Sequence, residues 1–394
     1  MEFFSKHTGQ RLAVAVLGYM VLLIFLLTWN PFYLAPPEGL NLSLRIGPRD
    51  AIRNILLFLP VGFLYRLMQG KIPGAILLGL AISGIAEVGQ LFMPARTPSF
   101  IDLGTNTLGA WMGTALHDLV ASRIAMSPRV VGRLALEVPL MGLLYLFVPL
   151  LWVNRLITGD IGRWLLTSLI GLCGAILLSD IYKQWWGPPG FRSLGRVALA
   201  AAVWFFVGLG PSLVARPWPG FASLVGIAIL TAVLAAIPRR AADHRFERAT
   251  LTRLLPFFII YLFLSALWPL SKPIVPWHGV FGLTDHFDAV TINFRLLEHL
   301  AAFTVLGYIS AEWRGRAELS WRRDFPRLLL VATSSALILE VFVGFQAGPG
   351  ASLLRATFAI LGALFGGVLY HLQRDHVRFL LGRPINAETT HMSA

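Results

Sequence analysis

The chain has one cysteine and few charged residues, and both shortages restrict what it can be. Its 394 residues include a single Cys, Cys173, which excludes an intramolecular disulfide framework and a cysteine metal cluster. Charged residues make up 13% of the chain and hydrophobic residues 56%, whereas about a quarter of the residues of a soluble protein are charged. This composition excludes an ordinary soluble globular protein.

Recognised catalytic and cofactor motifs are also absent. The sequence contains no H-E-x-x-H, no G-x-S-x-G, no P-loop and no cysteine–histidine metal spacing. We therefore predict no metal and no cofactor. The absence of motifs favours a non-enzymatic function, but it does not decide whether the protein is an enzyme.

Long apolar runs are what the sequence has in abundance. Runs of about 18 to 22 residues recur along the whole chain, and each is long enough to cross a bilayer as a helix. We predict an all-α integral membrane protein with about twelve transmembrane helices. The first run lacks a signal-peptide cleavage site, so we expect it to remain as the first helix. The predicted spans are 12–29, 51–68, 72–92, 99–121, 134–153, 164–182, 194–214, 218–237, 254–270, 292–311, 327–345 and 352–372.

The distribution of positive charge predicts the orientation. With the N-terminus in the cytoplasm, 23 of the 33 Lys and Arg residues fall on cytoplasmic segments and 10 fall outside. Because cytoplasmic loops carry the excess of Lys and Arg, we predict that both termini are cytoplasmic. The net charge of +13 is then explained by anionic membrane lipids as partners, and nucleic acid is not needed as a partner.

One polar stretch stands between apolar runs, "AEVGQLFMPARTPSFIDLGTNTLGAWMG" from Ala86 to Gly113. In the predicted orientation its polar residues, with one from the second span, meet at the outer face. A carboxylate within a span is a functional-site hypothesis, and the alternative is a structural polar network or an ion pair that holds a loop. The candidate ligand-binding residues are Asn54, Glu87, Gln90, Arg96, Asp102 and Asn106.

The same stretch recurs near the C-terminus. Extended to Leu119, as "AEVGQLFMPARTPSFIDLGTNTLGAWMGTALHDL", it lies without a gap over "LEVFVGFQAGPGASLLRATFAILGALFGGVLYHL", which places Glu87 on Glu340 at an offset of 253. Upstream, "NILLFLPVG" lies over "HLAAFTVLG", which places Asn54 on His299 at an offset of 245. The second-unit counterparts of the candidate site are therefore His299 and Glu340. Glycines at matched positions are expected to pack helices rather than to do chemistry; these are Gly62, Gly109, Gly113, Gly362 and Gly366.

This repetition predicts three units. Unit one spans 12–121 and unit two spans 254–372, and both have the same orientation, so the repeat is parallel. They flank a middle unit of four helices, 134–237. The units differ in their polar residues, because Arg96 aligns with Pro349 and Asp102 with Arg355. We expect Glu87 to pair with Arg96, whereas any pairing of Glu340 must use another position.

The two matched blocks resemble the VanZ-like family of bacterial membrane proteins. The resemblance rests on "NILLFLPVGFL" and on "EVGQLFMPARTPSFIDLGTNTLGAWMG". It covers unit one well and unit two in part, as a degenerate copy, and it does not extend to the middle unit. The residues that match the family pattern are Asn54, Phe58, Pro60, Gly62, Glu87, Gln90, Phe92, Pro94, Arg96, Asp102, Asn106, Gly109 and Gly113.

The resemblance implies a protein of the bacterial inner (cytoplasmic) membrane with a role in the cell envelope. The founding member of the family is associated with teicoplanin resistance, and relatives accompany envelope polysaccharide genes. We therefore expect action at the outer leaflet on an envelope lipid, polysaccharide or glycopeptide. Arg96 would pair with a phosphate, and the amides would bond hydroxyl groups. A transporter or flippase of a lipid-linked or small polar substrate, and an intramembrane enzyme on a lipid-linked substrate, remain alternatives.

The charge asymmetry yields a first testable prediction. In a Cys173→Ser background, a cysteine introduced as Arg240→Cys should resist an impermeant thiol reagent in intact spheroplasts, because its loop is cytoplasmic. The same cysteine should react once the membrane is permeabilised. Labelling in intact spheroplasts would reverse the predicted orientation.

Overall fold

Twelve α-helices make up nearly all of the part of the chain that the structure describes. The computed structural model describes residues 2–29, 35–36, 47–68, 70–93, 97–122, 128–156, 161–185, 190–213, 217–237, 246–280, 289–315, 319–348 and 350–380. The helices are α1 (Glu2–Thr28), α2 (Pro48–Leu67), α3 (Ile72–Gln90), α4 (Phe100–Ala121), α5 (Pro128–Leu156), α6 (Trp164–Trp185), α7 (Phe191–Leu213), α8 (Pro217–Ala236), α9 (Phe246–Ala266), α10 (Ala289–Glu312), α11 (Trp321–Val343) and α12 (Leu353–Leu380). The predicted all-α membrane architecture is confirmed.

Eight of these helices are long and apolar enough to cross a membrane: α1, α3, α6, α7, α8, α9, α11 and α12. The other four are α2, α4, α5 and α10. Helices α4, α5 and α10 place polar side chains inside the bundle, such as the buried Asn106, Asn154 and Glu298, and α2 carries charged residues near both ends. Helix bounds also exceed the predicted spans; α9 begins at Phe246 and α12 ends at Leu380. An apolar run marks only the part of a helix in hydrocarbon, because helical hydrogen bonding continues into charged ends.

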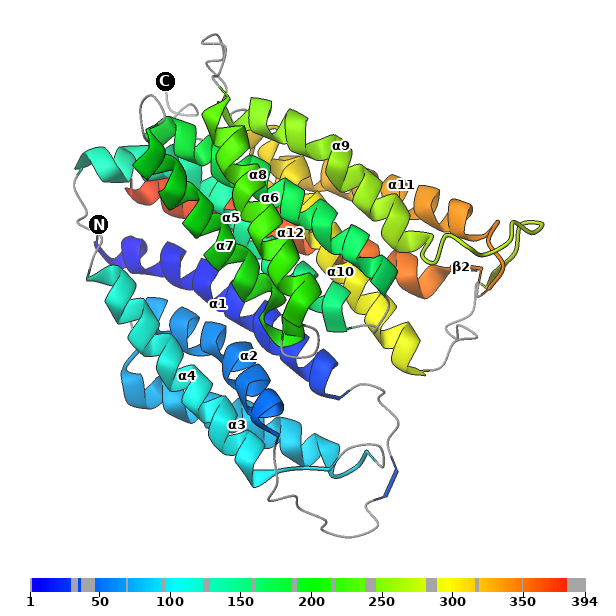
Figure 1. Cartoon of the computed structure of the whole chain (residues 1–394), viewed down its shortest axis with the longest axis horizontal. Coiled ribbons are helices and arrows are strands. Elements are labelled where there is room, and N and C mark those ends of the chain that lie inside the picture. Colours follow the sequence, from blue (N-terminus) through cyan, green and yellow to red (C-terminus); the bar gives the residue numbers. More distant parts are fainter. Residues whose placement is uncertain are drawn as a thin grey trace, which may run out of the picture.

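The helices run roughly along one common direction, and α1 begins at the same end of the bundle at which α12 ends (Figure 1). We call this end the Gln10 end, and the opposite end, where α3 finishes and α4 begins, the Glu87 end. Helices α2–α4 form a lobe on one side, with α1 between this lobe and the remaining helices (Figure 1). The short remaining elements are the 3-10 turn η1 (Ile161–Arg163) and the parallel pair β1 (Gly279–Val280) and β2 (Ala351–Ser352).

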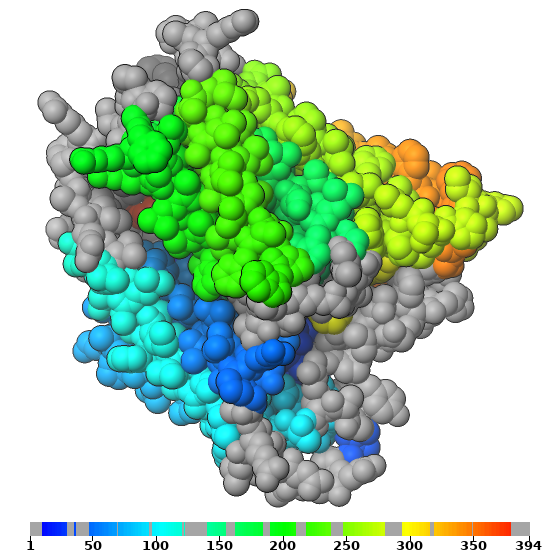
Figure 2. Space-filling view, in the orientation of Figure 1, coloured from blue at the N-terminus to red at the C-terminus, as the bar shows by residue number. Residues whose placement is uncertain are grey.

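Exposed apolar side chains cover several helices on the outside of the bundle. Figure 2 shows α7 and α8 as a broad face of the molecule beside the separate α2–α4 lobe. Large exposed apolar surfaces are rare on soluble monomers, and this one fits a surface in contact with lipid. Large apolar side chains that are at least half exposed include Leu77, Ile85, Val88, Leu199, Val203, Phe221, Val225, Ile229, Val233, Leu330, Leu337 and Ile338.

Glycines bring α2 into backbone contact with α4. A Cβ added at Gly62 would overlap the carbonyl oxygen of Ala110, and one added at Gly307 on α10 would overlap that of Ala363 on α12. These two contacts are related by offsets of 245 and 253, as the duplication predicts. The same relation joins Gly109 facing Ile55 to Gly362 facing Leu300, and Gly113 facing Leu59 to Gly366 facing Thr304.

The first helix of each unit departs from this correspondence. Helix α1 packs against α2 of its own unit and against α12, whereas α9 packs chiefly against α6 of the middle unit. The recurrence therefore involves three helices of each unit, namely α2–α4 in unit one and α10–α12 in unit two. The division of the chain into three four-helix units stays a prediction.

The close approach at Gly62 generates a second prediction. Gly62→Ala should lower the free energy of unfolding by about 1–3 kcal/mol, because the added methyl group must push α2 away from α4. Gly104→Ala is the matched control, since no atom lies within 4 Å of a Cβ there. Denaturant unfolding of the two variants in detergent micelles measures the difference. Equal losses would contradict the proposed contact.

Candidate functional site

The carboxylate of Glu87 lies against the start of α4. Its Oε2 accepts a hydrogen bond of 2.7 Å from the backbone N–H of Ser99. The hydroxyl of Ser99 in turn accepts from the backbone N–H groups of Ile101, at 3.2 Å, and Asp102, at 3.4 Å. The first N–H groups of a helix have no partner within it, so Ser99 acts as the N-cap. Glu87 is thereby held against the N-terminal end of α4.

Asn54 and Asp102 lie close to Glu87 near the start of α4. The Asn54 side chain on α2 lies near the Asp102 carboxylate and donates to Thr105 Oγ1 at 3.3 Å. The Glu87 and Asp102 carboxylates are close enough to repel each other. Asn54, Glu87 and Asp102 are each half-buried. We call Asn54, Glu87, Ser99, Asp102 and Thr105 the unit-one cluster; three helices supply it.

The structure places two other predicted site residues in contacts between helices. Gln90 Nε2 donates to the carbonyl oxygen of Thr28 at 3.3 Å, which ties α3 to the end of α1. Asn106 is buried, and its Nδ2 donates to Ser83 Oγ at 2.8 Å, which ties α4 to α3. Arg96 lies outside the described residues, so its expected pairing with Glu87 stays a prediction.

Unit two repeats the contact between the glutamate and the capping serine, but it has a different residue at the position of Asp102. Glu340 Oε2 accepts from the backbone N–H of Ser352 at 2.7 Å, as Glu87 does from Ser99. Arg355, which stands where unit one has Asp102, donates through Nε to Glu340 Oε1 at 3.2 Å and through Nη2 to Oε2 at 2.9 Å. Two parallel bonds of this kind are the strongest arginine–carboxylate geometry.

This ion pair is buried, so the unit-two site is inaccessible to solvent. Arg355 is 1% exposed and Glu340 5% exposed. Arg355 also donates to the carbonyl oxygen of Gly350, whose φ of +71° favours glycine. The position corresponding to Asn54 holds His299, which is buried and donates from Nδ1 to the Arg295 carbonyl oxygen at 2.8 Å. The expectation that Glu340 must pair at a position other than that of Arg96 agrees with this geometry.

The charged residues at the two sites differ in sign. Unit one has the carboxylates of Glu87 and Asp102, and Asp50 nearby is paired with Arg53. Unit two has the cations Lys272, Arg295 and Arg355 near one another, with Arg355 bonded to Glu340. In the loop after α9, burial lowers the pKa of Lys272, and the nearby Arg295 and Arg355 lower it further. The unit-one cluster is therefore the acidic and more open of the two.

A buried network of hydrogen bonds and one ion pair joins the middle unit to unit two, and it was not predicted from the sequence. Arg163, just before α6, donates to Glu298 Oε2 on α10 at 2.9 Å, and their side chains are 3% and 1% exposed. The Tyr261 hydroxyl donates to Glu298 Oε1 at 3.4 Å and accepts from Asn154 Nδ2 at 2.6 Å. The available signal was Glu298 inside an apolar span, since a charge there needs a partner.

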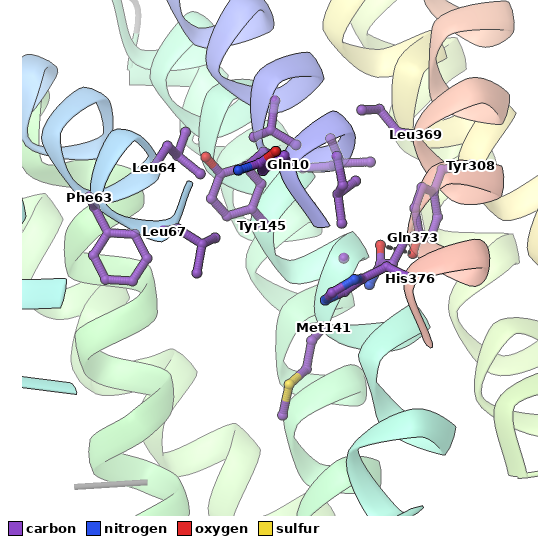
Figure 3. Close-up of a pocket in the computed structure, with 15 residues that line it drawn as sticks. Gln10, Phe63, Leu64, Leu67, Met141, Tyr145, Tyr308, Leu369, Gln373 and His376 are labelled. Atoms are coloured by element: carbon purple, nitrogen blue, oxygen red, sulfur yellow. Dashed lines mark hydrogen bonds between the residues drawn. The ribbon is translucent and has the colours of Figure 1, made fainter. Parts of the chain in front are cut away.

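A cavity of about 380 Å³ lies at the Gln10 end, away from the unit-one cluster and from the Glu340–Arg355 pair. It is bounded by α1, α2, α5, α10 and α12 (Figure 3). On α2, Asn54 of the unit-one cluster and Leu64 of the cavity wall are ten residues apart, about 15 Å along the helix axis. Within the described ranges, no three His, Cys, Asp or Glu side chains converge as metal ligands.

Comparison with known proteins identifies one region. Residues 4–121 match the model of the VanZ/LLP1 family. This segment contains α1–α4 and the whole unit-one cluster, and it is less than a third of the chain. No curated protein and no solved structure matches the chain.

The closed second site yields a third prediction. Arg355→Ala should cost about 3–5 kcal/mol of folding stability, because it leaves Glu340 buried without its cation. Asp102→Ala at the aligned position should cost much less, since Asp102 is half-buried. The double variant Glu340→Ala with Arg355→Ala should recover part of the loss, as denaturant unfolding would show. Equal costs for Arg355→Ala and Asp102→Ala would refute the importance of the pair.

Proposed function

Because residues 4–121 belong to the VanZ-like family, we propose that the protein acts in the bacterial inner membrane, with both termini cytoplasmic. There its unit-one cluster faces the outer leaflet and binds the polar part of an envelope lipid, polysaccharide or glycopeptide. A role of the teicoplanin-resistance type follows from the family.

One observation supports this proposal above the others. Two aligned sites are built on the same carboxylate-to-serine contact, and among the described residues only the carboxylate of the second site forms an ion pair with an arginine. Among the described residues, Glu87 accepts from the Ser99 N–H, and the Asn54 amide lies near Asp102. A ligand that supplied donors to these carboxylates would do in unit one what Arg355 does in unit two.

The chemistry of the cluster favours a particular kind of ligand. Ionised carboxylates only accept hydrogen bonds, whereas hydroxyl and amide groups can both donate and accept. Sugar hydroxyls, amino-sugar ammonium groups and peptide N–H groups meet these requirements. Saccharide and glycopeptide headgroups carry such donors, and Arg96 in the adjoining loop would suit a phosphate beside them.

Ligand capture tests the proposal. The protein in nanodiscs, analysed by native mass spectrometry, should retain an adduct from a polar lipid extract of bacterial envelopes or from added teicoplanin. Glu87→Gln combined with Asp102→Asn should weaken the adduct about 10- to 100-fold, because two charged hydrogen-bond acceptors are lost. Asp50→Asn is the matched control, since Asp50 is exposed at the same end and pairs only with the exposed Arg53 among the described residues.

The same experiment separates the alternatives. A transporter or flippase would move the captured ligand between leaflets, and this movement would be measurable in proteoliposomes. An enzyme would convert the ligand, and Glu87→Gln would then keep the adduct while abolishing the product mass. An adduct that survives the double substitution and is neither moved nor converted would overturn the assignment of the unit-one cluster.

A further inference from the structure

The cavity at the Gln10 end is a second candidate binding site, separate from the unit-one cluster. Its walls are mostly aliphatic or aromatic, and Figure 3 shows them converging from α1, α2, α5, α10 and α12. The apolar wall includes Leu12 and Val16 of α1, Leu64 of α2 and Leu369 of α12. Its volume of about 380 Å³ lies near the lower end of the range for small-molecule sites.

The rim of the cavity is apolar and exposed. Leu67, the last residue of α2, is 52% exposed, and Met141 on α5 is 38% exposed. Both residues line the cavity, so it is open to the surroundings between these two helices. In a multi-pass membrane protein, an apolar rim beside a helix end lies where the hydrocarbon of the bilayer meets the headgroups. The natural occupant of such an opening is a hydrocarbon chain.

One polar group inside the cavity points to an occupant with an oxygen atom. Tyr308 donates to Gln373 Oε1 at 2.6 Å, so this polar pair is satisfied within the wall. The hydroxyl of Tyr145 is buried and has no hydrogen-bond partner among the described residues. A buried hydroxyl is unfavourable unless it is hydrogen-bonded. Gln10, half-buried at the same cavity, offers an amide as a second donor.

We propose that this cavity binds one single-chain acyl amphiphile from the membrane. The carboxyl or ester oxygen of the amphiphile accepts a hydrogen bond from the Tyr145 hydroxyl, with Gln10 as a further donor. Its hydrocarbon chain runs along Leu12, Val16 and Leu64 and leaves the cavity between Leu67 and Met141. The volume suits one chain rather than a whole two-chain lipid. This site does not depend on the proposed function, because it lies at the other end of the bundle.

Photolabelling tests the site. The probe is palmitate with a diazirine in its chain, added to the full-length protein in nanodiscs of phosphatidylethanolamine and phosphatidylglycerol. We expect saturable labelling of α1, α2 and α5 residues that line the cavity, and competition by unlabelled palmitate. Tyr145→Phe should weaken half-maximal labelling about three- to tenfold, as the loss of one hydrogen bond implies.

A rim variant and its control make the test specific. Leu67→Trp should fill the opening and reduce labelling of the cavity wall at least about fivefold, by sterically excluding a chain from a close-packed wall. Leu77→Trp on α3 is the matched control, because Leu77 is also exposed, at 64%, and does not line the cavity. Both substitutions lie at exposed positions, so unfolding curves should match those of the unmodified protein.

Three results would overturn the proposal. Labelling of the cavity wall could fail to saturate and could equal the labelling of the exposed face of α3. The probe would then be reacting only from the bulk lipid. Leu67→Trp could label like Leu77→Trp, which would exclude entry at the rim. Tyr145→Phe could bind palmitate unchanged, which would exclude the hydroxyl as the donor. Glu87→Gln with Asp102→Asn should leave this labelling intact, so failure here is distinguishable from failure of the proposed function.

Discussion

Backbone contact between paired helices is the constraint on which the rest of the structure depends. Gly62 and Gly113 let α2 and α4 touch along their lengths, and Gly307 and Gly366 do the same for α10 and α12. Only because the helices approach so closely can an α2 amide reach an α4 carboxylate. The acidic cluster is therefore a product of helix packing, and side chains larger than glycine at these positions would separate its members.

Given this scaffold, one side chain decides the character of each site. In both units a glutamate accepts a hydrogen bond from the backbone N–H of a capping serine. The position that differs lies three residues after this serine; it is Asp102 in unit one and Arg355 in unit two. An aspartate there leaves two half-buried carboxylates side by side, and an arginine there neutralises the glutamate. The ligand that we propose for unit one would carry hydrogen-bond donors that reach both oxygens of one carboxylate, as Arg355 does in unit two.

Sequence patterns predicted what depends on periodicity and order along the chain. They gave the helix count, the alignment of Glu87 with Glu340 and the region that matches a known family. They failed where side-chain direction depends on tertiary packing. Gln90 and Asn106 share faces with site residues, yet bond neighbouring helices. Arg163 and Glu298 are 135 residues apart, and the cavity wall draws on five helices, so no local pattern could reveal either feature.

The contacts between the α2–α4 lobe and the rest of the bundle are unevenly distributed along its length. At the Glu87 end, Trp29 Nε1 donates to the Ala86 carbonyl oxygen at 3.1 Å, and Gln90 bonds the end of α1. At the Gln10 end the same seam contains the cavity between α1, α2 and α5. The lobe is therefore tied to α1 by hydrogen bonds at one end of the seam, whereas at the other end the space between α1, α2 and α5 is left for an occupant. Any molecule in the cavity would lie between the lobe and the rest of the bundle and would contact both.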